Sequence, residues 1–145
     1  MNEDPVEILL VEDNPHDVEL MRHAFARSKV TNSMRVVRDG AEALDFIFRT
    51  RATGVRLAQQ CPKVILLDLK LPKIDGLEVL RRVKSDPQTR NIPVVVLTSS
   101  SEERDIVMSY SSGANSYIVK PVDFDQFSEA VRQLGLYWML LNRAP

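Results

Sequence analysis

Short apolar runs alternate along the chain with longer stretches in which apolar residues recur every three or four positions. The runs predict β-strands, and they are Ile8–Val11, Met34–Val37, Val64–Leu67, Val94–Leu97 and Tyr117–Val119. The stretches between them predict helices, with apolar positions Val18, Met21 and Phe25, then Ala41, Leu44, Ile47 and Phe48, then Leu77, Leu80 and Val83. Two more helices are expected, one over Glu102–Ser112 that is closed by Gly113, and one from about Asp123.

This alternation favours an α/β fold. No hairpin signal such as Asn-Gly separates two apolar runs. The runs at 8–11, 64–67 and 94–97 are continuously apolar, as in strands that are buried on both faces of a sheet. We therefore expect a five-stranded parallel sheet, doubly wound, with five helices on its two faces. The stretch Arg49–Pro62 has no clear assignment, and either extends the second helix or forms a long loop.

Length and composition limit the number of domains, the class of partner and the cellular compartment that we expect. The 145 residues are the usual size of one domain, and 19 Lys and Arg against 20 Asp and Glu give a net charge of −1. This balance argues against nucleic acid as the main partner. The single cysteine, Cys61, fits a reducing compartment. No signal peptide is recognisable, and no apolar run approaches the roughly 20 residues that span a bilayer, so we expect a soluble, cytoplasmic protein without a membrane partner.

Polar residues interrupt the apolar pattern where the predicted strands end. Glu12 and Asp13 follow the first strand, Asp68 follows the third, Thr98 the fourth and Lys120 the fifth. The carboxyl ends of parallel strands share one edge of the sheet, which is where open α/β proteins bind ligands. We expect these five residues to meet in one cleft.

Such a cleft indicates a particular chemistry. Three clustered carboxylates repel one another unless they take up protons or bind a cation. Hard oxygen ligands without a nearby His or Cys favour Mg²⁺. Lys120 would place a positive charge, and Thr98 a hydroxyl donor, beside a phosphoryl group. A carboxylate could then act as the nucleophile and form an aspartyl phosphate.

Each of these signals has a simpler interpretation when it is taken alone. Asp13 or Asn14 could merely cap a helix that begins at Pro15. Tyr117 could be a core residue of its strand. Two histidines, His16 and His23, have no second set of ligands nearby and are expected at the surface. The convergence of several motifs on one sheet edge favours the functional interpretation.

Four segments carry a resemblance to a known family. LLVEDN, LLDLKLPKIDG, VVVLTSS and YIVKP resemble, in order and spacing, the receiver domains of two-component response regulators, of the chemotaxis-regulator-like kind. The similarity extends from about Glu7 to the last helix. It implies a flavodoxin-like strand order 2-1-3-4-5 in a single receiver domain over 1–145. It also implies a signalling switch rather than an enzyme, one that catalyses only its own phosphorylation and dephosphorylation.

The resemblance assigns the acceptor and the metal site residue by residue. Asp68 matches the phosphoacceptor. Asp13 matches the direct Mg²⁺ ligand, and Glu12 matches its acidic neighbour, which usually acts through a bound water. Lys70 matches the residue whose backbone carbonyl completes the metal site.

The resemblance also assigns the residues that read the phosphoryl group. Thr98 and Lys120 match the hydroxyl and the lysine that bind it. Tyr117 matches the switch aromatic, which turns inward when the hydroxyl moves. Lys120 and Pro121 match a peptide bond that is commonly cis. Whether Lys70 or Ser100 lengthens or shortens the life of the phosphoryl group stays open.

The C-terminal segment carries a second signal. One helical face is apolar at Phe127, Val131, Leu134, Trp138 and Leu141. If the helix continues, Leu136, Met139 and Leu140 project from the opposite side, which needs another partner. The interaction residues of the segment are expected to be Leu136, Tyr137, Trp138, Met139 and Leu140. Gly135 leaves open that this tail folds back. The ending LGLYWMLLNRAP resembles response regulators that are paired with bacterial phytochromes. This implies a bacteriophytochrome histidine kinase as donor and a homodimer made through 135–145.

Other functions remain as alternatives. A dehalogenase-type phosphatase also forms an aspartyl phosphate but wants an acid two residues later, where this chain has Lys70. A nucleotide- or flavin-binding domain needs a glycine-rich loop, and the five glycines form none. A receiver-like interaction module that is never phosphorylated would lack part of the acidic pair, the acceptor or the lysine. No output domain is expected within the chain, so the output would be protein contact, phosphorelay transfer or a phosphate sink.

Overall fold

The computed structural model describes residues 6–27, 33–52, 62–99, 111–120 and 122–133, and the statements that follow concern these. The strands are β1 Ile8–Val11, β2 Met34–Val37, β3 Val64–Asp68, β4 Val94–Thr98 and β5 Ser116–Val119. The helices are α1 Pro15–Arg27, α2 Gly40–Ala52, α4 Gly76–Ser85 and α6 Phe124–Gln133.

The strands form one parallel sheet in the order β2-β1-β3-β4-β5, which confirms the predicted fold class and strand order. Every residue of β1, β3 and β4 is buried, as their continuous apolar runs indicated. The register pairs Asp68 with Leu97 and Thr98 with Val119, so β3, β4 and β5 end at nearly the same level. The residues at these ends therefore lie along one edge of the sheet.

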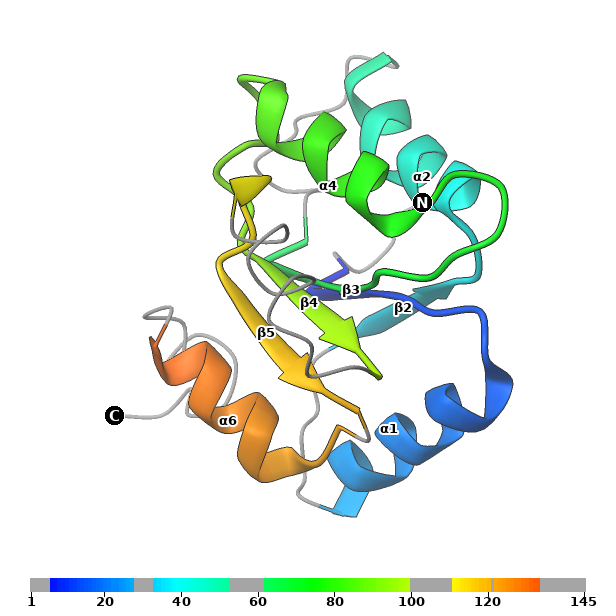
Figure 1. Cartoon of the computed structure of the whole chain (residues 1–145), viewed down its shortest axis with the longest axis vertical. Coiled ribbons are helices and arrows are strands. Elements are labelled where there is room, and N and C mark those ends of the chain that lie inside the picture. Colours follow the sequence, from blue (N-terminus) through cyan, green and yellow to red (C-terminus); the bar gives the residue numbers. More distant parts are fainter. Residues whose placement is uncertain (1–5, 28–32, 53–61, 100–110, 121, 134–145) are drawn as a thin grey trace, which may run out of the picture.

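In the described part of the chain, two helices cover each face of the sheet (Figure 1). Helices α1 and α6 lie on one face, and α2 and α4 lie on the other. Neighbouring residues of one strand point to opposite faces, so Leu10 packs in the core under α1 and α6, and Leu9 packs in the core under α2 and α4. On the first face Phe25 of α1 meets Phe127 of α6, with ring centroids 4.7 Å apart. This pair packs the last turn of α1 against the first turn of α6.

The boundaries differ from the predicted ones by small amounts. Helix α2 continues to Ala52, which extends the predicted second helix, while 53–61 lie outside the described residues. Most of the helix predicted over Glu102–Ser112 also lies outside them. Gly113 has a φ of +107°, a conformation that favours glycine. The C-terminal segment 135–145, Pro121, Cys61 and Ser100 lie outside the described residues as well.

Within the described part of the chain, no helix is both long and apolar enough to cross a bilayer.

Candidate functional site

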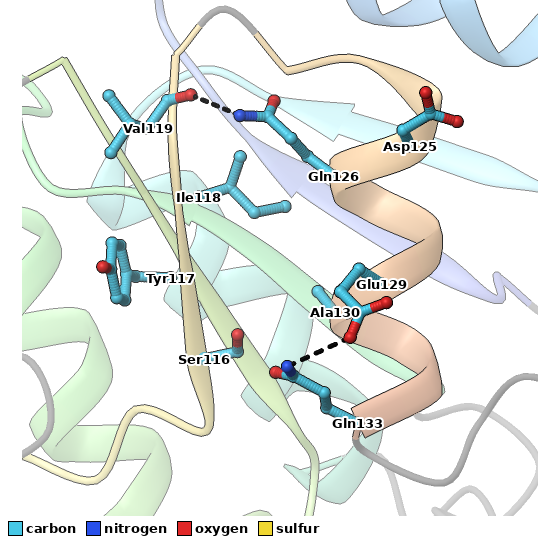
Figure 2. Close-up of a pocket in the computed structure, with 9 residues that line it drawn as sticks. All are labelled: Ser116, Tyr117, Ile118, Val119, Asp125, Gln126, Glu129, Ala130 and Gln133. Atoms are coloured by element: carbon cyan, nitrogen blue, oxygen red, sulfur yellow. Dashed lines mark hydrogen bonds between the residues drawn. The ribbon is translucent and has the colours of Figure 1, made fainter.

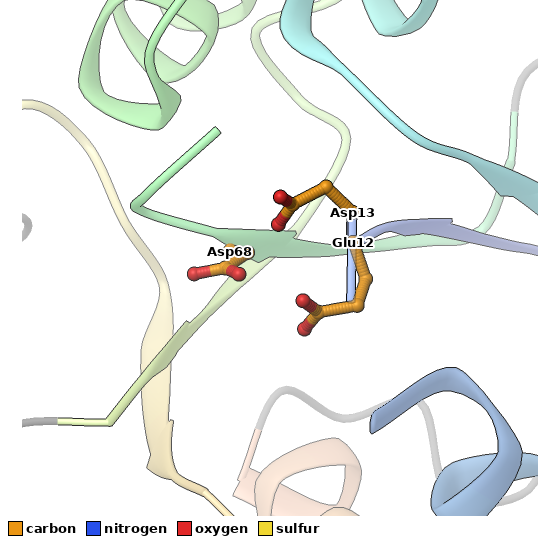
Figure 3. A group of neighbouring side chains, drawn as sticks. All are labelled: Glu12, Asp13 and Asp68. Atoms are coloured by element: carbon orange, nitrogen blue, oxygen red, sulfur yellow. The ribbon is translucent and has the colours of Figure 1, made fainter. Parts of the chain in front are cut away.

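Three carboxylates converge at the carboxyl edge of the sheet (Figure 3). Glu12 and Asp13 follow β1, and Asp68 is the last residue of β3. Each contributes one oxygen to a group in which all such atoms lie within 4.8 Å of one another. Glu12 is fully buried and Asp68 is 5% exposed, whereas Asp13 is open to solvent. The cluster therefore has a buried floor and an accessible side.

The start of α1 decides between the two interpretations of Asp13. The Asn14 side chain accepts hydrogen bonds from the backbone N–H groups of His16 (2.8 Å) and Asp17 (3.3 Å), which is the geometry of a helix N-cap. The Asn14 N–H in turn donates to Glu12 Oε2 at 3.2 Å. Asn14 is thus the cap, and the Asp13 carboxylate belongs to the acidic cluster.

Lys120 joins this cluster from the end of β5. Its Nζ donates to Asp68 Oδ2 and to Asp17 Oδ2, both at 3.0 Å. It also lies 2.8 Å from Glu12 Oε1, a distance that makes an ion pair, but without the geometry of a hydrogen bond. The Lys120 backbone N–H donates to the Thr98 carbonyl at 2.7 Å, which fixes where the lysine leaves the sheet.

Sequence reasoning missed Asp17. It lies in the first turn of α1, where an acidic residue is ordinary because it complements the helix dipole. No motif marks it, and its bond to Lys120 joins residues 103 positions apart. Only the packing of α1 beside the end of β5 brings the two together.

Burial and charge shift two pKa values in the cluster. Burial raises the pKa of Glu12 to about 7; nearby Asp68 acts in the same direction, and Lys120 opposes it. Burial alone would lower the pKa of Lys120, but its contacts with Glu12, Asp68 and Asp17 outweigh this and raise that pKa above its ordinary value. Lys120 therefore stays charged at neutral pH, while Glu12 lies near the midpoint of its titration.

A cleft of about 540 Å³ opens beside the cluster. Its lining includes Asp13, Lys70, Pro72, Asp75 and Thr98. Thr98 is 5% exposed and ends β4, which puts it at the wall of the cleft. The Lys70 N–H donates to Asp68 Oδ1 at 3.1 Å, so the loop after β3 orients the Asp68 carboxylate through its backbone.

The same loop, from Leu69 to Asp75, rests against the start of α2. A Cβ on Gly40 would lie 1.9 Å from the Ile74 carbonyl oxygen, so only glycine allows this approach. Lys73 has a φ of +69°, which is uncommon for a non-glycine residue, and its Nζ lies 3.4 Å from Asp39 Oδ2. The loop that lines the cleft is therefore fixed by its contacts with Asp39 and Gly40 at the start of α2.

Tyr117 lies on β5, but it is not a core residue. It is 36% exposed, whereas its neighbours Ser116 and Ile118 are buried. Figure 2 shows Tyr117 on the opposite side of β5 from Ile118 and from α6. On the α6 side, Gln126 Nε2 donates to the Val119 carbonyl at 3.4 Å, across a cleft of about 570 Å³ between β5 and α6.

The remaining expectations separate into two groups. His16 and His23 are exposed on α1, as expected for surface histidines. The Lys120–Pro121 peptide bond and the interaction residues Leu136, Tyr137, Trp138, Met139 and Leu140 fall outside the described residues.

The donor set fits a hard divalent cation. Among the described residues, Glu12 Oε1 is the buried side-chain atom that lacks a hydrogen-bond partner. It belongs to a group of three carboxylates that have one nearby ammonium, Lys120. Oxygen ligands of this kind are those that divalent ions such as Mg²⁺ and Mn²⁺ prefer.

Comparisons with known proteins show that the chain is similar to regulatory proteins in sequence and in structure. The probable methanogenesis regulatory protein FilR2 of Methanothrix harundinacea is 43% identical over 143 residues, which cover 99% of this chain and 90% of that protein. The structure of the bacteriophytochrome response regulator AtBRR is 50% identical, has a TM-score of 0.81, and the match covers 97% of this chain and 99% of that one. The Mn²⁺-bound form of the response regulator Rcp1 is 35% identical with a TM-score of 0.70, and the match covers 92% and 94% of the two chains.

A family model described as the response regulator receiver domain matches residues 8–132, which is most of the chain. This match includes all five strands and the acidic cluster at their carboxyl ends. The chain belongs to the receiver domain family of response regulators.

Proposed function

We propose that this chain is a single receiver domain over 1–145 that accepts a phosphoryl group on Asp68 in a Mg²⁺-dependent reaction. The observation that carries the proposal is the position of Asp68. Its Oδ2 is bound to Lys120 Nζ at 3.0 Å, and its carboxylate lies in the three-carboxylate cluster at the carboxyl edge of the sheet. A buried nucleophile, a fixed cation and a metal-type donor set are the parts that phosphoryl transfer to a carboxylate needs.

Each residue of the site would have its own role in the transfer of the phosphoryl group. An Asp68 oxygen attacks phosphorus, and the new O–P bond replaces the P–N bond of a phosphohistidine donor, whose nitrogen keeps the electron pair. The Lys70 N–H holds Asp68 Oδ1, which orients the carboxylate. Lys120 and the Thr98 hydroxyl would bind oxygens of the transferred group. The protein contributes mainly position and charge.

Glu12, Asp13, Asp68 and the backbone carbonyl of Lys70 would hold the metal ion, with Glu12 acting through a water. When it is bound, Mg²⁺ supplies positive charge against the phosphoryl oxygens and relieves the repulsion among the carboxylates. The fully buried Glu12 Oε1 and the accessible Asp13 support this assignment.

The output would be a change of surface. Thr98 and Tyr117 form the switch in this proposal, with Thr98 moving toward the phosphoryl group and Tyr117 turning inward. Tyr117 is exposed in this structure, so turning inward would be a change from the conformation seen here. The bond between Lys120 and Pro121 is proposed to be cis.

The proposed donor is a sensor histidine kinase of the bacteriophytochrome type, in the cytoplasm. The support is the similarity to AtBRR, whose name states that it is a bacteriophytochrome response regulator. A phosphate sink or a phosphorelay intermediate is the second role that the same chemistry would serve, and an aspartyl-phosphate phosphatase would need an acid where Lys70 stands.

We further propose that the chain forms a homodimer through segment 135–145, by Leu136, Tyr137, Trp138, Met139 and Leu140. Ending the chain after Leu134 removes these apolar side chains and should leave a folded monomer, whereas the full chain is dimeric. Light scattering measures both masses, and circular dichroism checks that the shortened chain is folded. Equal masses for the two chains would contradict the dimer.

The acceptor is tested with a small phosphodonor. The wild-type chain, incubated with acetyl phosphate and Mg²⁺, should take up one phosphoryl group that is stable to acid and labile to base. Asp68→Asn should take up none, because an amide cannot serve as the nucleophile, and chelation of Mg²⁺ should abolish labelling of the wild type. Intact mass spectrometry measures the uptake.

The matched control for this test is Asp45→Asn, because Asp45 is an exposed aspartate on α2. It should label like the wild type. Labelling that persists in Asp68→Asn would refute the acceptor, and labelling that persists without Mg²⁺ would refute the metal site.

A further inference from the structure

Asp17 takes one of the two directed hydrogen bonds from the Lys120 ammonium. Both bonds, to Asp17 Oδ2 and to Asp68 Oδ2, are 3.0 Å long. Glu12 Oε1 is closer, at 2.8 Å, but lies off the direction of a hydrogen bond. A directed bond fixes an ammonium more tightly than charge alone, because N–H···O bonds weaken steeply with angle. Nζ is therefore held by three carboxylates, and Asp17 is the one of the three that lies outside the acidic cluster.

The Asp17 carboxylate is itself well held. Its backbone N–H donates to the capping side chain of Asn14, and it lies in the first turn of α1, where the helix dipole favours an anion. Its side chain is 24% exposed, against 7% for Asp68 and none for Glu12. Asp17 is thus the most exposed of the three carboxylates that hold Lys120, and it lies at the rim of the site.

We infer that Asp17 is a positioning residue, which acts on the phosphoryl group through Lys120; this inference rests on the proposed function. A lysine side chain is a point charge on a flexible stem with three donors. Asp17 occupies one donor and leaves the other two for Asp68 and for an oxygen of the arriving phosphoryl group. Without this anchor, the ammonium would be held only by the two buried carboxylates, Glu12 at 2.8 Å and Asp68 at 3.0 Å, and nothing would hold it at the rim where the phosphoryl oxygen arrives.

The opposite effect, in which Asp17 competes for Lys120 and slows transfer, gives a prediction of opposite sign. The geometry favours positioning, because Lys120 reaches Asp68 and Asp17 at the same time. Its bond to Asp17 leaves the bond to Asp68 intact. A competitor would be expected to hold the lysine away from Asp68.

Two measurements on the full chain test the inference. The first is the rate of labelling by acetyl phosphate with Mg²⁺, which should fall about tenfold in Asp17→Ala, a loss typical of one charge-assisted hydrogen bond. Asp17→Asn keeps an acceptor oxygen and should recover part of the rate. Glu19→Ala is the matched control, an exposed acid on the same helix, and should label like the wild type.

The second measurement reports the anchor without any phosphoryl transfer. In ¹⁵N NMR of the metal-free protein, the Lys120 ammonium should give a signal slowed in hydrogen exchange, assigned by its loss in Lys120→Arg. Asp17→Ala should broaden it away, and Glu19→Ala should leave it in place. Thermal unfolding checks that each variant is folded, and Asp17→Asn serves in both measurements if Asp17→Ala does not fold.

The outcomes separate this inference from the proposed function. An unchanged or faster labelling rate in Asp17→Ala, with normal labelling of the wild type, would overturn the positioning role alone. An unchanged Lys120 signal in Asp17→Ala would overturn it as well. Failure of the wild type to label at all would overturn the proposed function and, with it, any role of Asp17 in transfer.

Discussion

Glu12 is a fully buried acid whose charge depends on its neighbours. One oxygen accepts the Asn14 N–H, and the other faces Lys120 without a hydrogen bond. Burial raises its pKa from an ordinary 4.5 to about 7. The folded protein therefore holds a proton on Glu12 at pH values where the unfolded chain has released it.

This shift predicts how the stability of the metal-free protein depends on pH. A raised carboxyl pKa stabilises the fold fully below about pH 4.5, and that contribution is lost as pH rises through about 7. In a chelator, Glu12→Gln should therefore lose less stability between pH 5 and pH 8 than the wild type, by roughly 1–3 kcal/mol. Urea unfolding at several pH values measures the difference.

The control for the pH prediction is Glu19→Gln, which changes an exposed acid and should follow the wild-type profile. Parallel profiles for the wild type and Glu12→Gln would mean that Glu12 carries its charge throughout this range. A bound divalent cation should flatten the wild-type profile, because it favours the ionised carboxylate.

At the residue scale, the sequence allowed the strand-end residues to be predicted, but not their partners. Glu12, Asp13 and Asp68 lie together as the parallel sheet required. Asp17 was not predicted as a site residue, because its partner Lys120 is distant in the sequence and their contact depends on how α1 packs beside the end of β5. The role of Asn14 as the helix cap became clear only from its hydrogen bonds.

At the scale of elements, the pattern of apolar residues predicted the strands well because β1, β3 and β4 are buried at every position. Helix α4 ends at Ser85, just before the Asp86-Pro87 pair, because the residue that precedes a proline is disfavoured in helical conformation. The contact between the Leu69–Asp75 loop and Gly40 could not be predicted, because the sequence around a glycine does not indicate which distant carbonyl it approaches.

Lys84 connects three elements at the end of the sheet opposite to the site. Its Nζ donates to the carbonyls of Arg90 (3.0 Å) and Ile92 (2.7 Å) and to Asn115 Oδ1 (2.9 Å). The Lys84 side chain is half-buried, and this burial lowers its pKa. Asn115 also accepts the Val94 N–H, so the cluster ties the last turn of α4 to the starts of β4 and β5.

Lys84→Met keeps most of the apolar stem and removes the ammonium, which leaves three acceptors with fewer donors. The free energy of unfolding should fall by about 1–2 kcal/mol, as for loss of charge-assisted bonds that are partly open to solvent. Phosphoryl labelling should be unchanged, because the cluster lies at the far end of the sheet. Chemical denaturation and acetyl phosphate labelling measure the two effects.

Arg81→Met is the matched control for Lys84→Met. Arg81 lies on the same helix and makes an exposed ion pair with Glu78, a kind of pair that contributes little. Its stability should stay within about 0.5 kcal/mol of the wild type. A loss of labelling in Lys84→Met would contradict the separation of this cluster from the site.

At the scale of the whole molecule, the site is assembled from both ends of the chain. Glu12 and Asp17 lie near its beginning, Asp68 at its middle and Lys120 near its end. The parallel sheet brings them to one edge, so any disturbance of the strand register would separate them. Through Lys120 the site is connected both to α1, by Asp17, and to β5, which lines the cleft against α6.

The central claim is that Asp68 carries the phosphoryl group, and it has a direct, site-resolved test. Borohydride reduces an aspartyl phosphate to homoserine, so the wild-type chain is labelled with acetyl phosphate and Mg²⁺, reduced, digested and sequenced by mass spectrometry. We predict homoserine at position 68 and unmodified aspartate at Asp13 and Asp17. Homoserine at either of those positions, or unmodified aspartate at position 68 in a labelled sample, would contradict the account.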